Sequence, residues 1–174
     1  PAKARAAQEC GALAAEARSL GESHAIEPWD WRHYAERVRA SFGLQHAMSL
    51  IGAEMALVEP GYVEIHLPHK AEVTQQHGFI HGGVVGMIAD SAAGYAANTL
   101  TPADTSVLTV EYKMNLVAPA DGQRLVARGE VVRPGRTLIV TRADVYAIRD
   151  EQWTLCAIMQ QTIMAMQGKS ERAG

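Results

Sequence analysis

The sequence predicts an α+β fold in which an antiparallel sheet wraps around one long buried helix, and three observations support this prediction. Residues 84–100 are apolar around most of the helical circumference and carry a single carboxylate, Asp90, a composition typical of a buried core helix. Two short segments before this helix and four long segments after it alternate in polarity, which is the period of a β-strand. Turn-forming residues separate these segments, so the predicted order is two strands, one helix and four strands.

The first 35 residues are expected to form a helical N-terminal extension, and residues 36–174 the main domain. Residues 2–20 are rich in alanine, glutamate, arginine and glutamine, which favour a helix. Gly21 marks the end of this helix, and a linker with Trp29 follows. A second helix is predicted over residues 31–51, with an interruption near Gly43, because apolar residues recur there at helical spacing.

Strands are predicted over residues 54–58 and 62–67, joined by the turn Glu59-Pro60-Gly61, in which proline presets φ and glycine tolerates a positive φ. After the helix, residues 106–117, 123–132, 136–148 and 152–166 are predicted to form four consecutive antiparallel strands, a meander. A sheet wide enough to curl around the helix would give the shape called a hotdog. The alternative is a flat sheet that leaves one helix face for another subunit or for the N-terminal helices.

Length, charge and cysteine content narrow the class of protein. The 174 residues, 48% of them hydrophobic, suit one globular domain with a core. A formal net charge of -3 gives no argument for nucleic-acid binding. Cys10 and Cys156 form no metal-binding or disulfide pattern, no signal peptide is recognisable, and the apolar helix is short for a membrane span. We therefore expect a cytoplasmic protein that binds neither nucleic acid nor membrane and has no metal site.

Gly82 and Asp90 lie at the start and in the middle of the predicted helix. Amides in a first helical turn have no intrahelical acceptor, and together with the positive end of the helix they can stabilise an oxyanion. A buried carboxylate such as Asp90 needs a partner or a function, and it could activate water or attack a carbonyl directly. Eight helical residues span ~12 Å, so one substrate carbonyl cannot touch both groups of the same helix. If both groups act on one substrate, the protein is a homodimer with sites across its two-fold interface.

The run His81-Gly82-Gly83, followed by Asp90 and by a threonine on the next strand, resembles the hotdog-fold acyl-CoA thioesterases of the phenylacetic-acid-degradation (PaaI-like) type. The resemblance covers roughly residues 36–166. It implies a homodimer, often paired into a homotetramer, that hydrolyses acyl-CoA thioesters without metal or cofactor. By position it implies Gly82 as the oxyanion donor, Asp90 as the base or nucleophile, and Thr109 as a hydroxyl that helps to orient water. Gln75 falls where several relatives carry asparagine, so it keeps the amide on a longer arm.

Residues beside the proposed chemistry are candidates for substrate binding. His81 and Gly83 flank Gly82, and we expect His81 to be a structural hydrogen-bonding residue rather than a base, because Asp90 already fills that role. Coenzyme A carries phosphates, so a few cations are needed near the entrance of the site. Arg133 and Arg136, on either side of the Pro134-Gly135 turn, are candidates, and a solvated surface position is the alternative for each.

The acyl pocket is expected to be lined by the central helix and nearby strands. Its candidates are Met87, Tyr95 and Met114, because methionine adapts to varied apolar shapes. Core packing explains these three residues equally well. Thr109 could likewise be an ordinary strand residue. Ser91 follows Asp90 but lacks the G-x-S-x-G motif of a nucleophile elbow, so we interpret it as a packing residue.

Two other functions remain open on the same fold. One is an enoyl-thioester hydratase, which generally needs a histidine paired with an acidic residue near the helix. The other is a non-catalytic acyl-CoA sensor, although residues 1–35 lack the basic face of a DNA-binding arm. Release of free thiol separates an enzyme from a sensor, and addition of water to an enoyl-CoA identifies the hydratase. The identity of the acyl group is not encoded in any spacing.

Overall fold

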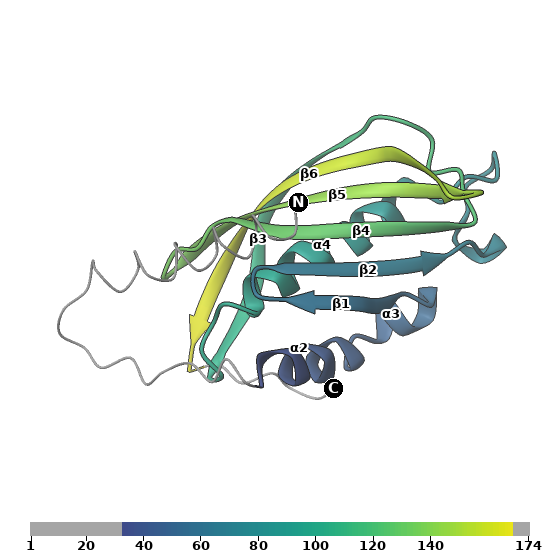
Figure 1. The fold of residues 1–174 in the computed structure, drawn as a ribbon. Helices are drawn as coiled ribbons and strands as arrows, with labels where there is room; N and C mark the ends of the chain where they lie inside the picture. The colour runs from purple at the N-terminus through teal and green to yellow at the C-terminus, as the bar shows by residue number, and fades with distance from the viewer. Residues whose placement is uncertain (1–32, 169–174) are drawn as a thin grey trace.

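Six antiparallel strands form one curved sheet in the computed structural model, which describes residues 33–168 (Figure 1). The strands are β1 (Glu54–Glu59), β2 (Tyr62–Pro68), β3 (Thr105–Leu116), β4 (Arg124–Arg133), β5 (Leu138–Arg149) and β6 (Gln152–Gln167). Each of them matches one of the six predicted strands, with boundaries that differ by two residues at most. The predicted helix over residues 2–20 and the linker after it lie outside the described residues. The division of the chain at residue 35 stays a prediction.

Two short helices precede the sheet, α2 (Tyr34–Gly43) and α3 (His46–Ile51). The predicted interruption near Gly43 is therefore confirmed. The helix α3 ends at Gly52, whose φ of 74° lies in the left-handed region that glycine adopts without a steric penalty. The short 3-10 helix η1 (Ala71–Val73) follows β2. Figure 1 shows α2 beside β1, at the edge of the sheet opposite to β3.

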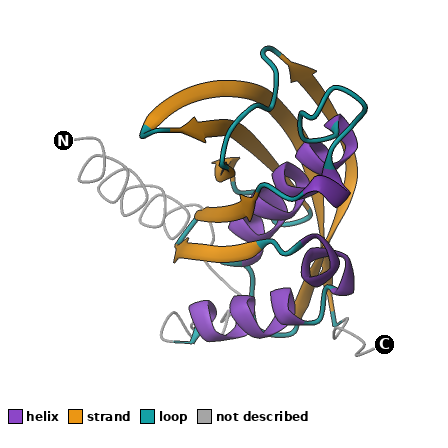
Figure 2. Cartoon of the chain, turned by 90° about the vertical axis from the view of Figure 1, so that its right-hand side faces the viewer, coloured by secondary structure: helices purple, strands orange, loops and turns teal. Residues whose placement is uncertain are grey.

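The long helix α4 (Gly82–Asn98) packs on the concave side of the sheet (Figure 2). Many of the side chains that face the core are small, and five alanines of the helix are fully buried: Ala89, Ala92, Ala93, Ala96 and Ala97. Small side chains let the helix approach the strands closely, and they leave few rotamers to be fixed on folding. The predicted core helix and the hotdog arrangement are both confirmed. Within residues 33–168, the helices are all too short or too polar to cross a membrane.

At Gly129 of β4, α4 lies close against the sheet. A Cβ built on Gly129 would lie 2.3 Å from the backbone carbon and oxygen of Ala92 and 2.4 Å from the nitrogen of Ala93. These are backbone atoms of a buried helix, which cannot move aside as the end of a side chain can. Gly129 is therefore required for the contact between helix and sheet.

We expect Gly129→Ala to destabilise the protein by about 3 kcal/mol, the upper part of the usual range for overpacking, because the helix must shift as a unit. Thermal unfolding followed by circular dichroism measures the effect. The matched control is Gly43→Ala, since a Cβ built on Gly43 has no atom within 4 Å. This control should keep or slightly raise the unfolding temperature. Equal unfolding temperatures for the two variants would contradict the assigned role of Gly129.

The strand β3 is not where the predicted meander placed it. The observed order is β1-β2-β4-β5-β6-β3, so β4 pairs with β2, and β3 pairs with β6. The connection between β3 and β4 crosses the end of the sheet, where the N–H of Val117 donates to the carbonyl of Cys156 at 2.9 Å. Alternation of polarity identifies a strand but not its neighbours, which is why the prediction of four consecutive neighbours was wrong. As a result β3 lies at an edge of the sheet.

Candidate active site

The loop before α4 holds the first turn of this helix in place. Its ends pair at the isolated bridge between Thr74 and Ile80, and the N–H of His81 donates to the carbonyl of Val73 at 2.9 Å. His81 is the N-cap residue of α4, and its Nδ1 accepts a hydrogen bond from the N–H of Gly83 at 2.9 Å. The amide of Gly82 has no hydrogen-bond partner within the part of the chain that the structure describes. The first turn therefore offers one free donor, at the positive end of the helix.

Asp90 is half-buried, and two side chains from the neighbouring strands β3 and β6 donate hydrogen bonds to it. The hydroxyl of Thr109, on β3, donates to Oδ1 of Asp90 at 2.7 Å. Nε2 of Gln161, on β6, donates to the same oxygen at 2.9 Å and to the hydroxyl of Thr109 at 3.3 Å. In residues 33–168 no hydrogen bond involves the second oxygen, Oδ2. The carboxylate is thus fixed through one oxygen and open at the other.

Gln161 is the residue of this cluster that the sequence analysis missed. It is separated from Asp90 by 71 positions, so no local motif connects the two. The alternation along β6 offered one signal. Gln161 is a polar residue in a row of inward-facing positions that are otherwise apolar. The others are Ala157, Met159, Ile163 and Ala165.

Three residues of α4 at intervals of four face β3. A Cβ built on Gly82 would lie 3.0 Å from Cδ1 of Leu116, and one built on Gly86 would lie 3.4 Å from Cε of Met114. Asp90 follows on the same stripe and meets Thr109. The predicted oxyanion donor and the predicted carboxylate therefore lie on one side of α4, next to an edge strand. Met114, a predicted pocket residue, lies beside them.

Three other predicted site residues have contacts of their own, and one of them, Met87, lies one helical turn before Asp90 on α4. Gln75 lies in the turn before α4, where its Oε1 accepts a hydrogen bond from the N–H of His77 at 2.5 Å. Met87 is half-buried and packs against the hydrophobic core. Tyr95 lies on the side of α4 that faces α2, with its hydroxyl 3.0 Å from Oγ of Ser41 and its ring edge-on to Phe42.

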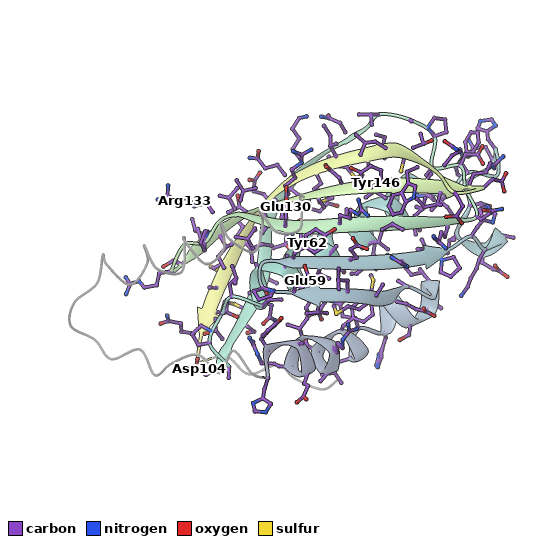
Figure 3. The ribbon with its side chains drawn as sticks, in the orientation of Figure 1. Glu59, Tyr62, Asp104, Glu130, Arg133 and Tyr146 are labelled. Atoms are coloured by element: carbon purple, nitrogen blue, oxygen red, sulfur yellow. The ribbon has the colours of Figure 1, made fainter. Side chains whose placement is uncertain are left out.

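The predicted phosphate-binding arginines, Arg133 and Arg136, are exposed at the turn between β4 and β5. Figure 3 shows Arg133 near the end of the sheet where this turn lies. The same end holds the residue that follows α4, because the N–H of Gly61 donates to Oγ1 of Thr99 at 2.7 Å and its carbonyl accepts from Val131 at 2.9 Å. The two arginines are therefore near the C-terminal end of α4, while Gly82 of the same protomer is at the N-terminal end.

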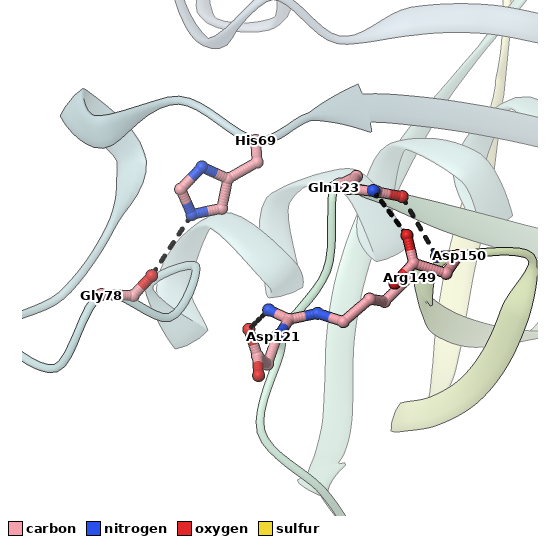
Figure 4. A network of polar contacts seen from close by, with 6 residues as sticks. All are labelled: His69, Gly78, Asp121, Gln123, Arg149 and Asp150. Atoms are coloured by element: carbon pink, nitrogen blue, oxygen red, sulfur yellow. Dashed lines mark hydrogen bonds and ion pairs between the residues drawn. The ribbon is translucent and has the colours of Figure 1, made fainter.

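A separate polar cluster lies near the N-terminal end of α4 (Figure 4). Arg149 pairs with Asp121, and Gln123 exchanges two hydrogen bonds with Asp150, at 3.0 Å and 3.2 Å. A surface hollow of about 430 Å³ is lined in part by Asp121, Arg149 and Asp150. Its lining includes two carboxylates and an arginine that is already paired, so this hollow is a poor place for a phosphate. It contains neither Asp90 nor Thr109.

Other kinds of chemistry find less support in residues 33–168. Cys156 is buried, and desolvation raises the pKa of its thiol to about 11, so the thiolate needed for nucleophilic attack is scarce at neutral pH. Ser91 donates its hydrogen bond to the amide oxygen of Gln45 at 3.3 Å and not to a basic side chain. His81 is bound to Gly83 and not to Asp90. Within the same residues, no group of three or more His, Cys, Asp or Glu side chains could hold a metal ion.

Comparisons with known proteins identify the family and the fold that this chain shares. Residues 77–154 match the family model described as the thioesterase superfamily. A thioesterase family protein from Silicibacter pomeroyi has 47% identical residues and a TM-score of 0.76, and the match covers 78% of this chain and 99% of that one. The 1,4-dihydroxy-2-naphthoyl-CoA hydrolase of Listeria monocytogenes is 31% identical over 121 residues, which are 70% of this chain and 94% of the relative. The PaaI protein of the E. coli phenylacetic acid degradation operon shares the fold, with a TM-score of 0.70 and 17% identity over 79% of this chain and 96% of that one.

Proposed function

This chain belongs to the thioesterase superfamily and has the hotdog fold, and from that membership we propose that it hydrolyses acyl-CoA thioesters. Asp90 is the general base or nucleophile of this reaction. The backbone N–H of Gly82 is the oxyanion donor, and it comes from the second protomer of a homodimer. The relative from Listeria monocytogenes is named as a 1,4-dihydroxy-2-naphthoyl-CoA hydrolase, which supports the CoA part of the proposal.

The state of Asp90 is the observation that carries this proposal. A carboxylate in an otherwise apolar helix is costly, and here Oδ1 receives two hydrogen bonds while Oδ2 remains open. Both protein donors bind the same oxygen, which leaves Oδ2 available to water or to a substrate. An open oxygen is what a general base or a nucleophile requires.

The need for a second protomer follows from distance. Gly82 and Asp90 are eight residues apart on one straight helix, or ~12 Å, which is too far for one carbonyl to touch both. Reciprocal contacts between Gly82 of each protomer and Asp90 of the other require the two α4 helices to run antiparallel about a two-fold axis. Each dimer then has two sites.

The edge strand β3 supports the proposed dimer. Four large apolar side chains on it are each about half exposed: Leu108, Val110, Tyr112 and Leu116. A long apolar edge strand with unpaired backbone groups is a surface that a second chain usually covers. The stripe of α4 that carries Gly82 and Asp90 lies beside this same edge. A further pairing of dimers into a tetramer stays a prediction.

The proposed reaction uses few groups. The thioester carbonyl accepts a hydrogen bond from the Gly82 N–H of one protomer, and the positive end of that helix stabilises the oxyanion that forms. In the base mechanism, Oδ2 of Asp90 takes a proton from water as the water oxygen attacks the carbonyl carbon. The tetrahedral intermediate then collapses, the carbon–sulfur bond breaks, and the thiolate of coenzyme A takes up the proton. In the nucleophile mechanism, Oδ2 attacks the carbonyl carbon, the carbon–sulfur bond breaks, and the thiolate of coenzyme A leaves and takes up a proton. Water then hydrolyses the resulting mixed anhydride, which releases the acid and restores the carboxylate of Asp90.

The antiparallel arrangement of the two α4 helices suggests where the coenzyme A phosphates and the acyl chain of the substrate bind. Thr99, at the end of α4, lies nine residues beyond Asp90, or about 14 Å. Arg133 and Arg136 lie at that end and are the proposed contacts for the phosphates of coenzyme A, whose pantetheine arm is long enough to span such a distance. Met114 and Met87 are the proposed contacts for the acyl chain, because both are only half-buried.

The release of free thiol from a panel of acyl-CoAs tests the proposed function. Aryl-acetyl, medium-chain and long-chain acyl-CoAs are each incubated with the full chain, and the new thiol is titrated with a chromogenic disulfide. The proposal predicts turnover of at least one substrate class by a protein that sediments as a dimer or a dimer of dimers. Binding of acyl-CoA without thiol release would overturn it and favour a sensor. Hydration of an enoyl-CoA would favour a lyase.

A further inference from the structure

The contact between Gln161 and Asp90 has a fixed direction. An ionised carboxylate accepts hydrogen bonds and donates none. The group of Gln161 that lies 2.9 Å from Oδ1 of Asp90 must therefore be the donor, Nε2. The other donor to Oδ1, the hydroxyl of Thr109, is 3.3 Å from the same Nε2. The three side chains thus form a closed triangle, with Gln161 as the donor to both of the other two.

The other end of the Gln161 amide has no partner. Gln161 is 1% exposed, and its Oε1 is buried without a hydrogen-bond partner in residues 33–168. A buried unpaired carbonyl destabilises a folded protein by roughly 1–3 kcal/mol, and the neighbouring inward positions of β6 hold apolar residues. An apolar side chain would fit this position better. Stability therefore does not account for the glutamine, and its donor end, which faces Asp90, does.

We propose that Gln161 is a positioning residue for the Asp90 carboxylate. This inference rests on the proposed function, since it assigns a role at the same site. With Thr109, Gln161 holds Oδ1 and so fixes the rotation of the carboxylate, while Oδ2 keeps no hydrogen bond to the residues that the structure describes. Because an amide cannot take up a proton at neutral pH, Gln161 always donates to Asp90 and never competes with it for the proton of water.

Three variants test this role. Gln161→Met fills the position with an apolar side chain of similar length and removes both the donor and the unpaired acceptor. Gln161→Glu keeps the shape but replaces the donor by a second carboxylate. The matched control is Gln160→Glu, which makes the same change one residue earlier on β6, where the side chain is exposed. The kcat, the KM, the pH profile of kcat/KM and the unfolding temperature are measured for the full chain.

We expect Gln161→Met to lower kcat about 10-fold to 100-fold while KM changes less than about 3-fold, because a misaligned group affects the chemical step more than binding. Its unfolding temperature should stay at or above that of the wild type. In Gln161→Glu two carboxylates share one site and retain one proton to higher pH. The reaction needs the ionised carboxylate, so the low-pH limb of the profile should move to higher pH. The control variant, Gln160→Glu, should have the same kcat as the wild type, and the low-pH limb of its kcat/KM profile should lie at the same pH.

Wild-type kcat and pH profile in both Gln161 variants would overturn the inference while leaving the thioesterase activity in place. A drop in unfolding temperature with unchanged kcat would also overturn it, since Gln161 would then be purely structural. Gln161→Met keeps the test decisive if the charged variant does not fold. Failure of the proposed function looks different, because the wild type itself would then release no thiol, and the inference would fall with it.

Discussion

We expect Asp90→Asn to lower the rate of thiol release about 10²-fold or more, the largest effect of any isosteric change in this chain. Asparagine keeps an Oδ1 that can accept from both Thr109 and Gln161, so the local structure should persist. What disappears is the negative charge and the basic Oδ2. The loss of rate therefore reports on chemistry rather than on folding. Free thiol is measured with the preferred acyl-CoA, and sedimentation checks that the assembly is unchanged.

The matched control for this substitution is Asp104→Asn. Asp104 is an exposed aspartate in the loop before β3, hydrogen-bonded to the hydroxyl of Thr105 at 3.3 Å. This variant should retain the wild-type rate. If Asp90→Asn and the control were equally active, the chain would still be a thioesterase, but the assignment of its carboxylate would be wrong.

We expect Gly82→Pro to lower kcat about 10²-fold to 10³-fold, as the loss of one oxyanion donor does in other acyl-transfer enzymes. Proline removes the N–H of residue 82 and changes little else, since Gly82 is the first residue of α4, where proline is well tolerated. The residue before it, His81, has φ -61° and ψ 135°, the extended conformation that a following proline requires. The measurement is kcat for thiol release, with circular dichroism to confirm that the helix content is retained.

Gly82→Ala is the control that isolates the hydrogen bond. Both substitutions add a Cβ that would lie 3.0 Å from Cδ1 of Leu116, the end of an exposed and movable side chain. Only proline also removes the N–H. The alanine variant should keep most of its activity, and an equal loss in both variants would mean that space at residue 82, and not its amide, matters.

The fold was largely predictable from the sequence, because its elements depend on local patterns. Alternation of polarity predicted all six strands, and the apolar segment with a single carboxylate predicted α4. The position of β3 at the sheet edge was not predictable in this way. Strand pairing depends on contacts between distant residues, and nothing in residues 105–116 encodes that β6 and not β4 will be the neighbour.

The site was predicted less completely than the fold. The motif around Gly82 and Asp90 made both residues candidates, which stay predictions, and the hydroxyl of Thr109 does contact Asp90. Gln161 was missed because the contact joins β6 to α4 across 71 positions of sequence. Tyr95 was a candidate because it lies on the central helix, but a position five residues after Asp90 is turned about 140° around the helix and meets α2 instead.

Activity of a hybrid dimer tests the central claim, that each site joins Asp90 of one protomer to the Gly82 amide of the other. Asp90→Asn and Gly82→Pro chains are co-expressed with different tags, and the hybrid is purified through both. Each parent dimer is inactive, but the hybrid has one site with an intact Asp90 and an intact Gly82, so we predict about half of the wild-type rate per dimer. A hybrid no more active than its parents would contradict the account and place both groups of the site on a single chain.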